Sequence, residues 1–118
     1  MSELDRCRKW LESALEYAGG THEWSDIVDS VSTGRMQLWP AEKSGAITEI
    51  LCYPRKKVLH VFLAGGDMIE LVNMIEDASR WGVSQGCKSI TMSGRKGWQR
   101  VLNKDDWSLK AVTMGREL

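Results

Sequence analysis

Glu49 and His60 are the residues whose types and spacing best suit acid–base chemistry. Pro54 and Arg55 separate two apolar runs, and a chain reversal there pairs the runs so that Glu49 lies opposite His60. A carboxylate beside an imidazole has the form of a general-base pair. The alternative is a polar cross-strand pair on a solvated face, which we favour because a register shift of one residue would separate the two side chains.

The string Gly94-Arg95-Lys96-Gly97-Trp98 is the most distinctive short motif. Arginine and lysine between glycines at a helix start can bind a phosphate or a carboxylate. The adjacent tryptophan can stack on an unpaired base or anchor a protein partner. A solvated turn whose tryptophan holds the short helix to the sheet is an equally good interpretation. Arg95, Lys96 and Trp98 are therefore the candidate interaction residues.

Other residue patterns add no predicted site. The three cysteines are widely spaced and form no CxxC pair, so neither a zinc site nor a redox pair is expected. Cys52 and Cys87 stand in or beside apolar strands and are expected to be buried and reduced. The basic string 55–57 is expected to be a solvated hairpin tip. No Walker loop, dinucleotide fingerprint or nucleophile elbow is present.

Two helices are predicted at the N-terminus, over about residues 2–33. Ser2 and Asp5 form a capping pattern, and apolar residues then recur at helical spacing up to Gly19-Gly20. Thr21 is a suitable cap for the second helix, which Gly34 ends. The helical pair thus precedes a region in which the apolar period changes to two.

The rest of the chain alternates strands and helices. Strands are predicted over 35–39, 46–53, 57–64, 88–92 and 107–114, and helices over 68–84 and 97–103. Asp67 and Glu70 fit a capping box at the start of the long helix. A strand, this helix and the next strand form a right-handed βαβ unit with parallel strands. The predicted fold is α/β in the order ααβββαβαβ, with a mixed sheet of about five strands in a single domain over 1–118.

Composition excludes several functional classes. The chain has 118 residues with sixteen basic and sixteen acidic side chains, so zero net charge makes nucleic acid unlikely as the main partner. No apolar run is long enough to span a membrane, and no secretory signal is expected. The widely spaced cysteines are expected to be reduced thiols, so the expected location is the cytoplasm.

The segment from Ile47 to Trp107 resembles the GNAT acyltransferase fold. The resemblance rests on the strand 58–64, the turn Gly65-Gly66-Asp67, the helix 68–84, the string 80–90 and the string 97–104 before Trp107. It implies acetyl-CoA as cofactor, with Gly65 and Gly66 as candidate cofactor-binding residues. Two positions depart from the family pattern. The turn lacks a basic residue and carries Asp67, which would repel a phosphate, and Leu102 stands where a tyrosine general acid is common.

The sequence also resembles the small GNAT-like proteins encoded in the structural modules of tailed bacteriophages. The similar segments are 34–40, 48–50, 63–66 and 94–98. This resemblance implies a place in the bacterial host cell or in the virion, and other virion proteins as partners.

Three functional hypotheses follow. The first is a non-catalytic, degenerate GNAT-like interaction protein of a phage virion or its assembly, with no cofactor. The second is an acetyl-CoA-dependent N-acyltransferase with Glu49 or His60 as base. The third is a small phage regulator of a host protein.

Overall fold

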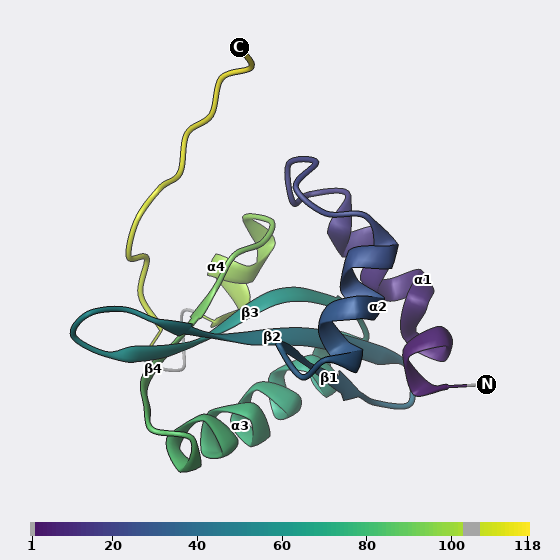
Figure 1. Cartoon of the computed structure of the whole chain (residues 1–118), viewed down its shortest axis with the longest axis horizontal. Helices are drawn as coiled ribbons and strands as arrows, with labels where there is room; N and C mark the ends of the chain where they lie inside the picture. Colours follow the sequence, from purple (N-terminus) through teal and green to yellow (C-terminus); the bar gives the residue numbers. More distant parts are fainter. Residues whose placement is uncertain (1, 103–106) are drawn as a thin grey trace.

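A four-stranded mixed sheet forms the centre of the protein (Figure 1). The computed structural model describes residues 2–102 and 107–118. Its elements, in chain order, are α1 (Glu3–Leu15), α2 (Trp24–Ser32), β1 (Met36–Pro40), β2 (Ser44–Cys52), β3 (Lys57–Gly66), α3 (Met68–Ser84), β4 (Cys87–Met92) and α4 (Gly97–Leu102). None of these helices is long and apolar enough to cross a membrane.

The strands lie side by side in their chain order. β1, β2 and β3 are antiparallel, and β4 runs parallel to β3 after the α3 crossover. The predicted hairpin register is confirmed, since Glu49 pairs with His60. A bulge in β3 opposite Ile47 and Thr48 changes which side chains face each layer.

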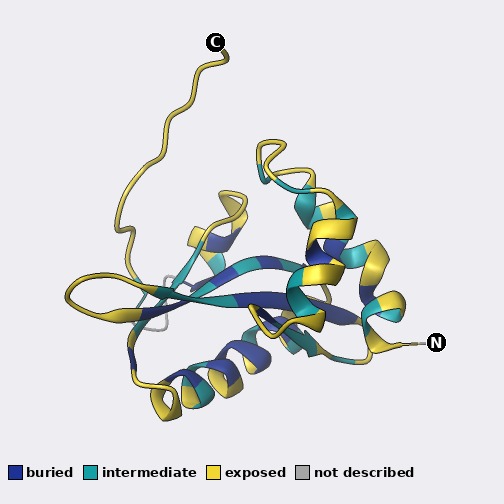
Figure 2. Ribbon diagram, in the orientation of Figure 1, coloured by how far each residue is buried: buried dark blue, intermediate teal, exposed yellow. Residues whose placement is uncertain are grey.

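Helices cover both faces of the sheet (Figure 1). α1 and α2 pack on one face around Cys7, Leu11 and Ile27, together with residues of β1, β2 and β3. α3 covers the other face, and Trp98 and Leu102 of α4 extend the same apolar layer. Figure 2 shows the buried residues concentrated between the sheet and these helices.

Local hydrogen bonds set the helix starts. Ser2 caps α1 by accepting from the Asp5 amide, as predicted, and Asp67 caps α3 by accepting from the Ile69 amide. Glu23, rather than Thr21, caps α2. The Thr21 hydroxyl donates instead to the Ala18 carbonyl at the end of the preceding turn.

The predictions for the last strand and for Cys52 were wrong. Residues 107–114 form no strand, so the described sheet has four strands rather than about five. A strand needs a neighbour for its backbone hydrogen bonds, and beyond Trp107 this segment instead runs through solvent (Figure 1). Cys52 is exposed because the β2–β3 hairpin extends past the covering helices (Figure 2), whereas Cys87 is buried as predicted.

Candidate functional site

A row of polar side chains crosses three strands of the sheet. Glu49 on β2 pairs with His60 on β3, which in turn pairs with Thr91 on β4. The His60 Nδ1 and Thr91 Oγ1 atoms lie 2.8 Å apart and form a hydrogen bond. Leu59 and Val61 face α3, so the alternation of the strand turns His60 toward the opposite face. All three polar side chains are half-buried.

Burial sets the protonation of His60. Desolvation lowers the pKa of the imidazole below its ordinary value, and the nearby Glu49 carboxylate partly opposes this by favouring the charged form. The neutral imidazole therefore predominates at neutral pH and can accept a proton. Sequence reasoning paired Glu49 with His60 but missed Thr91, because the register of the parallel strands depends on how α3 packs.

The turn Gly65-Gly66-Asp67 is packed against the protein's own backbone. A Cβ atom on Gly65 would lie 2.4 Å from the Trp10 carbonyl oxygen of α1, and one on Gly66 would lie 2.3 Å from the Lys43 carbonyl oxygen. The Asp67 amide donates to that same Lys43 oxygen over 3.0 Å. These glycines therefore allow close approach of α1 and the β1–β2 loop.

Acidic groups surround this turn. The Asp67 side chain accepts from the Ile69 amide at the N-terminus of α3. Glu70 makes no capping box with Asp67, contrary to the prediction. Its carboxylate accepts from the Lys43 amide and the Ser44 hydroxyl over 2.9 and 2.6 Å, and these bonds lower its pKa. The turn thus presents two carboxylates where the GNAT resemblance would require a phosphate site.

The predicted interaction residues divide into a surface and a core part. Arg95 and Lys96 are exposed on the turn that follows β4. The Arg95 guanidinium carbon lies 4.9 Å from the centre of the Tyr17 ring, which is itself 61% exposed just after α1. Trp98 is only 9% exposed and packs with Leu102 against α3, so it anchors the short helix. The exposed aromatic side chain in contact with Arg95 is therefore Tyr17 rather than Trp98. Tyr17 and Arg95 are far apart in the chain, so the sequence alone does not reveal this contact.

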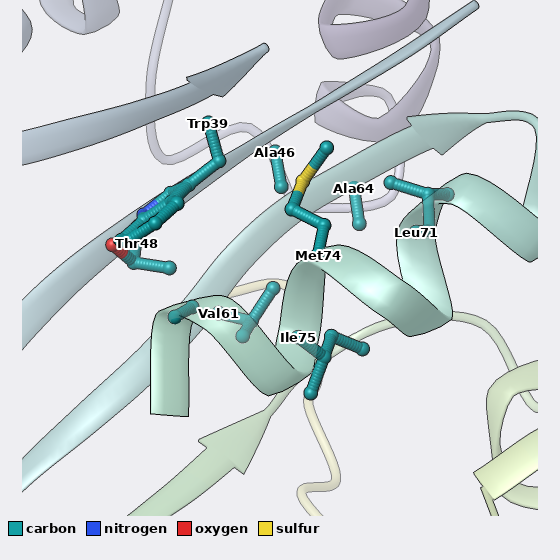
Figure 3. Close-up of a pocket in the computed structure, with 9 residues that line it drawn as sticks. Trp39, Ala46, Thr48, Val61, Ala64, Leu71, Met74 and Ile75 are labelled. Carbon is teal, nitrogen blue, oxygen red and sulfur yellow. The ribbon is translucent and has the colours of Figure 1, made fainter. Parts of the chain in front are cut away.

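The layer between the sheet and α3 holds little free space. Figure 3 shows the hollow between α3 and strands β1 to β3, where Met74 and Leu71 point toward Ala46 and Ala64. Its volume is about 10 Å³, room for about one water molecule. A second hollow of about 200 Å³ lies between the C-terminal half of α3 and β4. No group of three or more metal-ligating side chains occurs among the described residues.

Comparison with known proteins identifies the fold. No family model and no curated protein matches the sequence. An acetyltransferase from Trypanosoma brucei is similar in structure, with a TM-score of 0.64 and 17% identity over 100% of this chain and 96% of that one. So is an aminoglycoside acetyltransferase from an uncultured soil metagenomic sample, solved with sisomicin, with a TM-score of 0.66 and 11% identity over 100% and 93%. A V. cholerae integron cassette protein matches with a TM-score of 0.65 and 9% identity over 98% and 85%.

These similarities define a GNAT-like α/β fold, the fold that the sequence resemblance implied. Sequence identity this low establishes the fold alone, because proteins of one fold have many activities and function depends on the residues of the site.

Proposed function

We propose that this protein is a GNAT-like domain that binds another protein and does not transfer acyl groups. The observation that carries the proposal is the filled turn at Gly65 and Gly66. A phosphate site at a helix start needs free amides and room for the anion. Here the Asp67 amide is bound to Lys43 and the Ile69 amide to the Asp67 side chain. The backbone of α1 and of the β1–β2 loop occupies the space that an added side chain at either glycine would need, so the two glycines serve this packing.

Two further features support a non-catalytic role. Asp67 and Glu70 would repel the phosphates of a nucleotide cofactor at the start of α3. Leu102 stands at the position where the family often has a general acid. It is 5% exposed, and its alkyl side chain has no ionisable proton to donate.

The proposed binding surface consists of Tyr17, Arg95 and Lys96. An exposed aromatic ring in contact with Arg95, with exposed Lys96 next in the chain, suits an acidic protein surface, since tyrosine and arginine are enriched among residues that dominate binding energy. Because the sequence resembles GNAT-like proteins of tailed-phage structural modules, the partner we propose is another virion protein, in the particle or during its assembly.

Titration calorimetry with acetyl-CoA tests the absence of cofactor binding. We expect no saturable heat, and a dissociation constant in the micromolar range would overturn the proposal. Asp67→Gly removes the acidic cap at a cost of about a few tenths of a kcal/mol. It is also expected not to bind, because the two glycines stay packed against backbone. Cofactor binding by this variant would instead reveal a latent site in the turn.

A pair of double variants tests the binding surface. Arg95→Ala with Lys96→Ala should leave the melting temperature nearly unchanged, since an exposed cation–π contact contributes about 0.5–1 kcal/mol. The same variant should reduce incorporation into purified particles. Arg55→Ala with Lys56→Ala removes two cations from the exposed hairpin tip and serves as the matched control. Equal incorporation of both variants would exclude the surface.

The row Glu49-His60-Thr91 supports a second candidate, acyl transfer. A neutral imidazole hydrogen-bonded to a hydroxyl can act as a base toward an amine. This candidate requires acetyl-CoA to bind elsewhere than the filled turn. Turnover of acetyl-CoA with an amine acceptor, abolished by His60→Gln, would favour it over the binding role.

A further inference from the structure

The charged side chains of this neutral chain are segregated along its sequence. Residues 10–34 contain five acidic side chains and neither lysine nor arginine, whereas residues 78–104 contain six lysines and arginines and no acidic side chain. The acidic stretch includes α2, and the basic stretch includes the C-terminal end of α3 and all of β4. Figure 1 shows α2 over one half of the sheet and the start of β4 toward the opposite end of the molecule. Surfaces of opposite charge therefore lie well apart on one chain.

The acidic surface is the solvent side of α2 and of its N-cap residue. Glu23 and Asp26 are exposed and form the capping box of the helix, and Asp29 is exposed one turn further on. Val28 stands between these carboxylates and is 37% exposed, although Ile27 beside it is fully buried. α2 thus presents an apolar side chain with acidic groups around it.

The basic surface surrounds the hollow of about 200 Å³ between the C-terminal half of α3 and β4. Its lining is largely apolar and includes Leu59, Gly82 and Ile90. Val83, on the α3 side of the hollow, is 73% exposed, and Lys88 lines the β4 side. Lys57, at the start of β3, reaches the same end of α3 and donates to the Gln85 carbonyl oxygen over 3.4 Å. Neither lysine forms an ion pair with another described residue.

We propose that copies of this chain associate head to tail, with α2 of one copy docked in the α3–β4 hollow of the next. Val28 then enters the apolar hollow, and Asp29 faces Lys57 and Lys88, in the manner of a helix held in a groove.

A second copy is the occupant because the chain itself carries the surface of opposite charge, and its zero net charge produces no overall repulsion between copies. The two surfaces lie well apart on the molecule (Figure 1), so two copies cannot satisfy both contacts at once. The association therefore forms an open chain of copies rather than a closed pair.

Sedimentation and light scattering of the full chain test this association. We expect the average mass to rise beyond that of a dimer as the protein concentration increases. Added salt should reduce the average mass, because it screens exposed charges. A parent chain that stays monomeric at low salt throughout the micromolar range would overturn the proposal.

Two double variants each remove one of the two surfaces. Val28→Lys with Asp29→Lys alters α2, and Val83→Glu with Lys88→Glu alters the hollow. All four residues are exposed, so both variants should melt close to the parent. Each variant alone should associate with a Kd raised by about tenfold or more. An equimolar mixture should pair with the affinity of the parent and stop at two copies, because each variant keeps one intact surface.

Arg55→Ala with Lys56→Ala is the matched control. It removes two cations from the exposed hairpin tip beyond the hollow and should change the Kd much less than the hollow variant does. Equal weakening by the control and by the hollow variant would overturn the docking site, because a general charge effect does not distinguish them. A mixture of the two folded surface variants that associates no better than either one alone would also overturn the proposal.

Discussion

Single residues explain why the glycine turn serves packing. Gly65 has no side chain where a Cβ would meet the Trp10 carbonyl oxygen at 2.4 Å, and backbone cannot move aside as a flexible side chain can. We predict that Gly65→Ala lowers the free energy of unfolding by about 1–3 kcal/mol, measured by urea denaturation. Gly97→Ala is the control, because no atom lies within 4 Å of its added Cβ. Equal stability of the two variants would contradict the close packing of the α1 backbone against Gly65.

The histidine of the polar row makes a pH-dependent contribution to stability. Burial lowers the pKa of His60, so the unfolded chain binds a proton more readily than the folded one. The stability that the neutral imidazole contributes is complete above the ordinary histidine pKa of about 6.5. It is lost as the pH falls through the lower pKa that His60 has in the folded protein. We predict that the drop in stability from neutral to mildly acidic pH is smaller in His60→Gln than in the parent.

An NMR titration of the same side chain gives a direct check. The pKa of His60 should lie below 6.5 and should fall further in Glu49→Gln, since the carboxylate favours the charged imidazole. A pKa at or above 6.5 in the parent would contradict the buried position of the ring.

At the scale of elements, the β1–β2 loop is held between two helices. Arg6 of α1 donates to the carbonyl oxygens of Ala41 and Glu42 over 2.6 and 3.0 Å. Glu70 of α3 accepts from the Lys43 amide and the hydroxyl of Ser44, which is fully buried. The loop therefore couples α1 to α3 across the end of the sheet.

The loop contacts predict different effects for two glutamates of α3. Glu70→Gln should lower the melting temperature at neutral pH, because a charged acceptor is replaced by a neutral one. Glu76→Gln changes an exposed residue of the same helix and should leave the melting temperature unchanged. Hydrogen bonds lower the pKa of Glu70, so its contribution is present above its ordinary value and lost as the pH falls through the folded value. The difference between parent and Glu70→Gln should therefore shrink in acid.

At the scale of the whole molecule, the two covered faces of the sheet determine which thiols are accessible. Cys7 lies on the buried face of α1 with no exposed surface, and burial raises the pKa of its thiol. Cys87 is 8% exposed. Cys52 is exposed at the end of the hairpin. We predict that a thiol reagent labels one cysteine quickly in the native protein and all three after unfolding. Cys52→Ser should abolish the fast labelling phase. A fast phase that survives this change would contradict the burial of Cys7 and Cys87.

The sequence alone determined the features that depend on nearby residues. The long helix over 68–84 and its Asp67 cap were predicted correctly, because apolar period and capping act within a few residues. The pairing of Glu49 with His60 was also correct, since a short turn sets the register of a hairpin.

Only the tertiary structure decided the features that depend on distant segments. Thr91 reaches His60 across a parallel ladder whose register is set by α3. Arg95 contacts Tyr17, which lies in the connection between α1 and α2, far away in the chain. The glycine turn resembled a cofactor loop in sequence, but the backbone of α1 and of the β1–β2 loop packs against it. Cys52 and the segment 107–114 carry strand-like patterns without the neighbours that would bury or pair them. Burial and pairing require a second surface, and a local pattern holds no information on where that surface lies.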